Sequence, residues 1–344
     1  MSVSNATIDK KYLIIGPSWV GDMVMAQSLL IDIKAREPEC QIDMLAPAWT
    51  AAITDRMPEV KQLIAANFNH GKLSLGERVR LGKQLRLQQY SNAILLPNSL
   101  KSALVPAVAK ITTRTGFIGE QRWGLLNDIR KLDKKVLPMT VQRFVALGLE
   151  KGAAVRSIDS IPVPQLVVDP AAAQQVLDAN KLNVDKPVLV LCPGAEFGPS
   201  KQWPVAHYAA VANHYLAQNW QVWLLGSDKD HAVCKELDAT TEGRTQVLAG
   251  KTSLPQAVDL MSFASLVVAN DSGLMHIAAA LQKPLVAVYG STDPGHTPPL
   301  SGNHAIARLT LDCSPCFKRE CPLQHLDCLT RLTPSKVLEL AEAL

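Results

Sequence analysis

The residues best suited to chemistry lie in a short turn, residues 270–276 (Asn-Asp-Ser-Gly-Leu-Met-His), between an apolar run and a helical run. Free amides at the start of such a helix favour a bound anion, so we interpret the turn as a phosphate site. The alternative is that Asp271 or Ser272 only caps the helix and that His276 lies on the helix surface. Asp271 would repel a phosphate, and we expect it either to cap the helix or to bind hydroxyl groups of the same ligand. The inferred ligand is a sugar attached to a phosphate.

Two glycine-containing loops add candidate groups. In residues 192–204, Gly194 and Lys201 precede a predicted helix, where amides and a lysine would offset charge growing on a diphosphate leaving group. Residues 16–22 (Gly-Pro-Ser-Trp-Val-Gly-Asp) end in Asp22, where a triphosphate-binding loop would need a lysine. The G-x-G-x-x-G dinucleotide fingerprint is also missing from this loop, so neither a nucleoside triphosphatase nor a dehydrogenase is favoured. Asp22 is then either a carboxylate presented to a substrate or only a helix cap.

Apolar runs alternate with helical patterns along the whole chain, which predicts parallel sheets with helices on both faces. Residues 151–164 lack periodicity and are interpreted as a linker. We therefore predict a domain over residues 1–160, a second over 161–330 and a C-terminal helix over 331–344. Ligands of such sheets bind at the carboxyl ends of the strands. At that edge of the second domain, Asp230 is a candidate contact for a ribose, and the apolar backbone of residues 248–254 is a candidate contact for an adenine-like base.

The charge distribution differs between the two halves of the chain. The net charge is +4, but residues 1–160 hold 22 Lys and Arg against 14 Asp and Glu, whereas residues 161–344 hold 13 against 17. The first half therefore suits an anionic partner, for which Lys101, Arg114 and Arg122 are the candidate contacts, although dispersed charge can also serve solubility alone. Nucleic acid is not favoured, because the basic residues are scattered and no binding motif is found.

Cysteine usage and hydropathy indicate an intracellular protein. Four of the seven cysteines cluster at Cys313, Cys316, Cys321 and Cys328. Two interpretations stay open for this cluster. It is either a zinc site or a loop with free thiols that is structural or faces the substrate. Disulfides are not expected in a reducing cytoplasm. No run approaches the roughly 18 apolar residues that span a bilayer, and the start has no apolar signal core, so we expect a cytoplasmic protein.

Six ordered blocks of the sequence resemble the ADP-heptose:lipopolysaccharide heptosyltransferase family, which is glycosyltransferase family 9. The resemblance runs from about residue 12 to the C-terminal helix and is greatest for the members that add the second inner-core heptose. The blocks are residues 16–22, 97–104, 123–128, 193–201, 270–276 and 313–316.

The resemblance implies a GT-B fold, in which two Rossmann-like parallel-sheet domains face each other across a cleft. It also implies an inverting, metal-independent transfer from ADP-heptose, without a further cofactor, to the first heptose on the lipid A-Kdo core. The N-terminal domain would bind this acceptor, and the enzyme would be a peripheral protein at the cytoplasmic face of a Gram-negative inner membrane.

The family pattern also implies roles for single residues. Asp22 matches the proposed general base, Lys201 the residue at the diphosphate, and Asp271 the contact to the donor heptose. Ser272, Gly273 and His276 match the phosphate turn, with Gly194 in the loop whose amides bind phosphate and Thr252 at the adenine. Asp230 matches the ribose residue only loosely.

Three alternatives stay open at this point. One is a non-catalytic nucleotide-sugar or lipid-binding protein, which would not need Asp22. The second is another GT-B enzyme that uses a UDP-sugar, and the third is a heptosyltransferase that adds the first heptose. Neither the phosphorylation of the acceptor nor the oligomeric state follows from the sequence.

Overall fold

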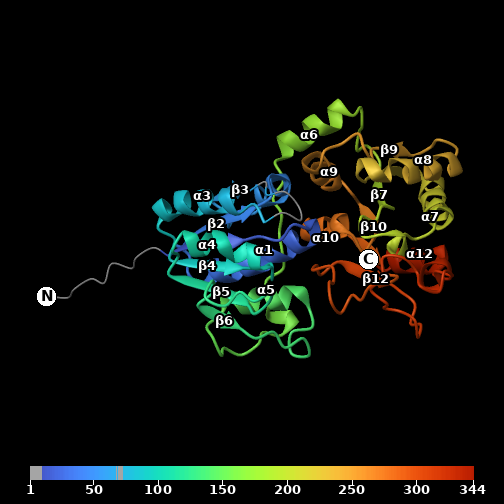
Figure 1. Ribbon diagram of the computed structural model, residues 1–344. Helices are drawn as coiled ribbons and strands as arrows, with labels where there is room; N and C mark the ends of the chain where they lie inside the picture. Colours follow the sequence, from blue (N-terminus) through green and yellow to red (C-terminus); the bar gives the residue numbers. More distant parts are fainter. Residues whose placement is uncertain (1–9, 67, 69–72) are drawn as a thin grey trace. The chain divides into compact units, whose positions relative to one another are not determined.

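The computed structural model of the chain describes residues 10–66, 68 and 73–344. The chain folds into two compact units, Met1–Pro162 and Val163–Leu344, which we call unit 1 and unit 2. Unit 1 runs from blue to green and unit 2 from yellow-green to red in Figure 1. The C-terminal helix, predicted as a separate segment, packs against a helix and two strands within unit 2.

Unit 1 contains one six-stranded sheet in the order β3-β2-β1-β4-β5-β6, and every neighbouring pair of strands is parallel. Its elements in chain order are β1 (Lys11–Ile15), α1 (Val20–Arg36), β2 (Gln41–Ala46), η1 (Ala48–Thr50), α2 (Ala51–Thr54), β3 (Gln62–Ala65), α3 (Leu75–Leu85), η2 (Arg86–Gln88), β4 (Asn92–Leu95), η3 (Leu100–Ala103), α4 (Leu104–Val108), β5 (Thr113–Phe117), β6 (Asp128–Arg130), α5 (Thr140–Gly148) and η4 (Ile158–Ser160).

Unit 2 contains a second parallel sheet of six strands in the order β12-β11-β10-β7-β8-β9. Its elements are α6 (Pro170–Ala179), β7 (Val188–Cys192), η5 (Pro199–Lys201), α7 (Val205–Ala217), β8 (Gln221–Leu224), η6 (Asp228–Asp230), α8 (His231–Thr240), β9 (Gln246–Val247), α9 (Leu254–Met261), β10 (Leu266–Asn270), α10 (Gly273–Ala280), β11 (Leu285–Val288), β12 (His304–Ala307), α11 (Asp327–Thr330) and α12 (Pro334–Glu342).

The two sheets have the same topology, because the strand order of unit 2 read from β9 repeats that of unit 1 read from β3. In each sheet the direction of winding reverses between two central strands, β1 and β4 in unit 1 and β7 and β10 in unit 2. Loops at such a switch point diverge above the carboxyl ends of the strands and leave a crevice for a ligand. The loops that the sequence analysis selected, those with Asp22, Lys201 and Asp271, all follow switch-point strands.

Burial explains why the strands read as apolar runs. In β1, Leu13 and Ile15 pack with Leu85 of α3 and Val105 of α4 in one cluster, so the alternate residues point to the opposite face. Helices α1 and α5 pack against each other, as do α3 and α4. In β7 and β10 every residue is buried, as expected for strands covered on both faces. The predicted alternation of strands and helices around parallel sheets is confirmed.

Some helices differ from their predicted form. The sequence of residues 48–57 has a helical pattern, but only a short 3₁₀ turn and α2 form there, and α2 ends at Thr54. Pro106 lies in the first turn of α4, where its missing amide is not needed and the helix is not broken. Among the described residues, no helix combines the length and the apolar character required to cross a bilayer.

Candidate active site

Asn270 joins the two loops at the switch point of unit 2. It is the last residue of β10 and is fully buried. Its side-chain oxygen accepts hydrogen bonds from the Tyr208 hydroxyl (3.0 Å) and the Trp203 amide (3.2 Å), and its nitrogen donates to the Pro193 carbonyl (2.8 Å). A buried amide satisfied on both sides fixes the geometry of its neighbours. The loop after β7 is therefore held beside the turn after β10.

Asp271 and Lys201 form a buried ion pair across these two loops. Lys201 Nζ lies 2.6 Å from Asp271 Oδ2, and the side chains are only 13% and 5% exposed. The same carboxylate oxygen accepts a hydrogen bond of 2.5 Å from the Thr292 hydroxyl, which follows β11. Ser272, and not Asp271, is the cap residue of α10, so the predicted capping role of Asp271 is not observed. Its contact with a donor sugar stays a prediction.

The start of α10 offers unsatisfied donors to an anion. Ser272 precedes the helix, Gly273 is its first residue, and the first amides of a helix have no partner within it. Ser272 Oγ is also buried, and it has no hydrogen-bond partner within the part of the chain that the structure describes. A bound phosphate would satisfy both the hydroxyl and the amides. The geometry of the turn is thus compatible with the predicted phosphate site.

His276, on the first turn of α10, is buried and close enough to the ion pair to be affected by it. Burial lowers the pKa of His276 to about 4, while Asp271 raises it and Lys201 lowers it by smaller amounts. The imidazole is therefore neutral near pH 7. It can offer a hydrogen bond to a phosphate, but it supplies no positive charge.

The depressed pKa of His276 predicts acid sensitivity. In the unfolded chain this histidine has an ordinary pKa near 6.5 and is protonated below that pH, whereas in the folded protein it stays neutral down to about pH 4. The free energy of unfolding should therefore fall as the pH drops from 6.5 to 4, by about 3 kcal/mol for this group. Denaturant titrations at several pH values should show that the slope of the free energy of unfolding against pH is smaller in His276→Gln than in the wild type. The slope should be unchanged in the control His214→Gln. Equal slopes in all three proteins would contradict the assignment.

The remaining donor-side candidates lie in neighbouring loops of unit 2. A Cβ added at Gly194 would lie 2.3 Å from Asp230 Cγ, so a larger residue would displace the Asp230 carboxylate. Asp230 Oδ2 accepts hydrogen bonds from the amide and the hydroxyl of Ser227, both 2.8 Å long. Thr252 is half-buried, and its hydroxyl donates to the Leu248 carbonyl (3.3 Å). The predicted contacts of Asp230 with a ribose and of Thr252 with adenine stay predictions.

In unit 1, Asp22 lies in the first turn of α1, directly after the loop that follows β1. It is partly exposed. Lys101 lines a cavity of about 280 Å³ at the switch point of unit 1. Gly16 and Ser18, from the loop after β1, and Ser99, from the loop after β4, line the same cavity. The cavity is where the carboxyl ends of β1 and β4 diverge. Of the three predicted acceptor cations, Lys101 is the one that lines it.

The structure does not favour direct acceptor contacts for the other two cations. Arg122 is fully buried and donates to the Pro97 carbonyl (2.8 Å), the Ser102 hydroxyl (3.2 Å) and the carbonyl of Phe117, and burial lowers its pKa. Arg114 uses its guanidinium on the carbonyls of Leu125 (2.7 Å) and Ile111 (2.6 Å). These arginines tie together the loops after β4 and β5. The physical reason is that carbonyl oxygens of the loops already accept hydrogen bonds from several N–H groups of each guanidinium.

Two arginines that sequence reasoning missed lie beside the candidate groups. Arg78 also lines the cavity of Lys101, stacks over the Phe68 ring at 3.7 Å and donates to the Lys101 carbonyl (3.0 Å). Nothing in the local sequence distinguishes it from the other basic residues of α3. In unit 2, the exposed Arg319 shares the ring of Phe197 with Lys201.

The cysteine loop is attached to the loop of Lys201. The Ser200 amide donates to the Arg319 carbonyl (3.2 Å), and the Ser200 hydroxyl donates to the Lys318 carbonyl (2.5 Å). All seven cysteines are free thiols, and among the described residues no group of three or more His, Cys, Asp or Glu side chains is arranged to hold a metal ion. The loop of residues 313–328 therefore supports the loop of Lys201 directly.

Comparison with known proteins gives consistent matches over the chain. Residues 78–327 match the family described as glycosyltransferase family 9 (heptosyltransferase). Lipopolysaccharide heptosyltransferase 2 of Escherichia coli K12 is 45% identical over 342 residues, which cover 97% of this chain and 98% of that protein. Lipooligosaccharide heptosyltransferase 2 of Haemophilus influenzae is 50% identical over 307 residues, 86% of this chain and 88% of that one. The structure of E. coli ADP-heptose lipopolysaccharide heptosyltransferase II has a TM-score of 0.85 at 43% identity, with 97% of this chain and 98% of that one covered.

Proposed function

The chain belongs to glycosyltransferase family 9, the heptosyltransferases, and on this basis we propose that it transfers heptose from ADP-heptose to the first heptose of the lipopolysaccharide inner core. The acceptor is then the heptosyl-Kdo-lipid A core. Two parallel sheets of identical topology agree with the GT-B architecture of such enzymes. The relatives named heptosyltransferase 2 favour this acceptor over the heptose-free core that heptosyltransferase I would use.

One observation carries the proposal furthest, the buried pair of Lys201 and Asp271 at the switch point of unit 2. A lysine held there by a carboxylate and backed by the unsatisfied donors of the α10 turn suits a diphosphate. Such groups stabilise charge that develops on a leaving ADP more than they stabilise the bound ground state. A protein that only binds a nucleotide sugar would gain nothing from that difference.

Inversion at the anomeric carbon requires one displacement. The acceptor hydroxyl loses its proton to a base as its oxygen forms the new bond to that carbon, while the bond to the diphosphate oxygen breaks and ADP leaves with the electron pair. Asp22 is our proposed base. Asp22 belongs to unit 1 and Lys201 to unit 2.

No cofactor is needed in the proposed reaction. The charge of the leaving ADP is offset by Lys201 and by the amides of the α10 turn, which perform the task that a divalent cation performs in other nucleotide-sugar enzymes. Turnover should therefore persist when the purified protein is assayed in excess EDTA. Loss of turnover in EDTA that added Mg²⁺ restores would overturn this part of the proposal.

The test of the function is a release assay with two acceptors. Purified protein should release ADP from ADP-heptose when the heptosyl-Kdo-lipid A acceptor is present and not when the acceptor lacks its heptose. Release only with the heptose-free acceptor would favour heptosyltransferase I, and binding without release would favour a nucleotide-sugar-binding protein. A larger thermal shift with UDP than with ADP would indicate a different GT-B donor.

Arg319 is expected to assist in donor binding. Its guanidinium lies 5.4 Å from the Phe197 ring, and the ammonium of Lys201 lies 4.9 Å from the same ring, so the two cations are neighbours. Because Lys201 is paired with Asp271, Arg319 would add to the positive charge that Lys201 presents to a diphosphate. Arg319→Ala should raise the KM for ADP-heptose roughly tenfold. The matched control is Lys318→Ala, which removes an adjacent exposed charge, and equal effects in the two variants would count against the role.

The proposed acceptor is a lipid, so we also propose that the enzyme works as a peripheral protein at the cytoplasmic face of the inner membrane. The excess of basic residues in the first half of the chain supports an anionic surface as the partner of unit 1.

A further inference from the structure

Unit 1 contains a second cavity, of about 690 Å³, which has no lining residue in common with the cavity of Lys101. It lies where β5 and the edge strand β6 meet the C-terminal end of α5 and the segment that follows this helix. None of the groups assigned to the transfer reaction lines it. The cavity therefore requires a separate explanation.

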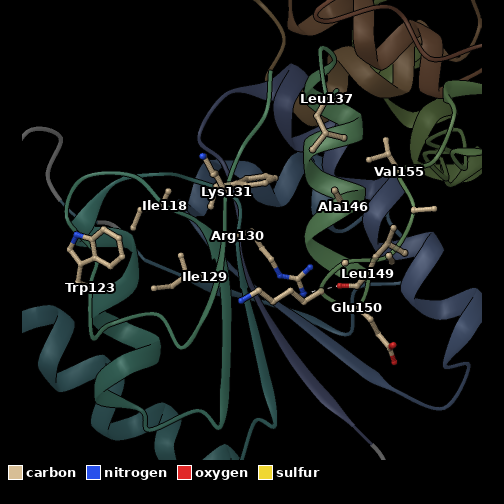
Figure 2. Close-up of a pocket in the computed structure, with 15 residues that line it drawn as sticks. Ile118, Trp123, Ile129, Arg130, Lys131, Leu137, Ala146, Leu149, Glu150 and Val155 are labelled. Atoms are coloured by element: carbon tan, nitrogen blue, oxygen red, sulfur yellow. Dashed lines mark hydrogen bonds between the residues drawn. The ribbon is translucent and has the colours of Figure 1, made fainter. Parts of the chain in front are cut away.

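The walls of this cavity are mostly apolar. Figure 2 shows Ile118, Trp123 and Ile129 on one side and Leu149 and other apolar side chains on the other. Trp123 is 67% exposed, an unusual exposure for the largest apolar side chain. Val155, which lines the cavity, is 43% exposed, and Val136, next to the lining residue Leu137, is 51% exposed. Such a concentration of exposed apolar groups marks an interaction site.

Lysines surround the apolar walls. Lys131 and Lys151 line the cavity, and Lys134 and Lys135 are exposed on the short segment between Lys131 and Leu137, which both line it. No salt bridge of these four lysines occurs within the described part of the chain. These lysines therefore give the surface an excess of positive charge.

The nearby acidic groups do not cancel this charge. Arg130, which also lines the cavity, is paired with Asp128 through bonds of 2.9 and 2.7 Å and donates to the Leu149 carbonyl (2.9 Å). That pair is neutral as a whole. Asp133 and Glu150 are also exposed, and two negative charges against four lysines leave a net charge of +2.

An exposed tryptophan among lysines beside an apolar cavity has the composition of a site that meets a lipid–water interface. Tryptophan is favoured at the level of lipid headgroups, because its ring is apolar and its indole N–H is polar. Lysines are attracted to the negative potential of anionic lipids, and this attraction adds to apolar burial. A protein partner would more commonly meet an apolar patch with fewer lysines.

We propose that this surface, defined by Trp123, Lys131, Lys134, Lys135 and Val136 and called here the Trp123 surface, docks unit 1 on an anionic phospholipid bilayer. Trp123 enters the headgroup region, the apolar cavity accepts part of a lipid acyl chain, and the lysines contact lipid phosphates. The inference rests on the proposed function, since a lipid-linked acceptor requires the enzyme to stay at the membrane. Beyond that function, the inference identifies which surface of unit 1 contacts the lipid bilayer.

Sedimentation with vesicles tests the surface on the full-length protein. The protein should bind vesicles of phosphatidylcholine mixed with phosphatidylglycerol and bind pure phosphatidylcholine weakly. Lys134→Gln/Lys135→Gln should weaken binding by roughly fivefold per charge at low salt, and Trp123→Ala should weaken it further. The matched controls are Lys186→Gln/Lys235→Gln, two exposed lysines of unit 2, and Trp49→Ala, a tryptophan of unit 1 that is 47% exposed. Variants that bind like the wild type would overturn the proposal.

Two further measurements separate other outcomes. Transfer to a water-soluble acceptor without acyl chains should be unchanged in these variants, so a loss of that activity would mean damage to unit 1 and not loss of docking. If the wild type transfers to neither acceptor, the proposed function fails while the vesicle result still decides the docking surface. A dimer that dissociates in Trp123→Ala, seen by light scattering without any vesicle binding, would show that the surface meets a second copy of the chain and overturn the proposal.

Discussion

Asp22→Asn is expected to lower the turnover number about 10²–10⁴-fold and to leave the affinity for ADP-heptose nearly unchanged. Asparagine keeps the shape of the side chain but cannot accept the proton of an acceptor hydroxyl. The donor groups, including Lys201 and the α10 turn, all lie in unit 2, so the substitution does not touch them. Calorimetric titration with ADP-heptose and single-turnover assays with acceptor measure the two quantities separately.

The effect of Asp22→Asn on turnover must be distinguished from an effect on stability. Asp22 lies in the first turn of α1, where a negative charge interacts favourably with the helix dipole, by about 0.3–1 kcal/mol. Such a change lowers the melting temperature slightly and cannot account for a hundredfold loss of rate. Asp55→Asn, at an exposed carboxylate of the same unit, serves as the control and should keep full activity. A donor affinity that falls in parallel with turnover would remove Asp22 from the role of base.

The sequence predicts the fold well because its signals are local. Strands such as β7 and β10 are continuous apolar runs, and the turn that follows β10 has a polar, glycine-containing sequence typical of a helix start. The carboxyl ends of parallel strands share one edge of their sheet, which is why the loops of Lys201 and Asp271 could be assigned to one site. Their direct pairing could not be predicted, because it depends on β7 and β10 being neighbours, although 70 residues separate the two side chains.

Side-chain burial was the other unpredictable property. Arg122 and Lys101 both read as surface cations near an anionic acceptor, yet Arg122 is fully buried against the carbonyls of neighbouring loops. No local pattern distinguishes an arginine that binds a ligand from one that ties loops together. Arg319 was missed for a similar reason, since it lies among cysteines whose spacing is the stronger local signal. Its position depends on hydrogen bonds from Ser200, in a loop more than 100 residues away.

Lys201→Met is expected to reduce both stability and activity. It leaves the carboxylate of Asp271, which is 5% exposed, with the Thr292 hydroxyl but without a compensating charge. Breaking a buried pair in this way costs about 3–5 kcal/mol of the free energy of unfolding. Loss of a cation from the leaving group should lower turnover by a further factor of about 10²–10³, as the removal of one transition-state donor does elsewhere.

The double variant Lys201→Met/Asp271→Asn separates these two effects. With both charges removed, no buried ion is left without a partner, so most of the lost stability should return. Turnover should stay low, because the cation that offsets charge on the departing ADP is still missing. Denaturant unfolding and initial rates with ADP-heptose give the two readouts.

An exposed ion pair of unit 2 serves as the control for the buried pair of Lys201 and Asp271. Lys229 and Glu196 lie 2.5 Å apart in the same unit, but their side chains are 73% and 53% exposed. Solvent-exposed ion pairs contribute little to stability, so Lys229→Met should change neither unfolding nor rate appreciably. If the Lys201 and Asp271 double variant regained turnover together with stability, the ion pair would be only a structural link between two loops. The positive charge at the diphosphate would then have to come from another residue, and Arg319, which lies over the same Phe197 ring as Lys201, is a candidate.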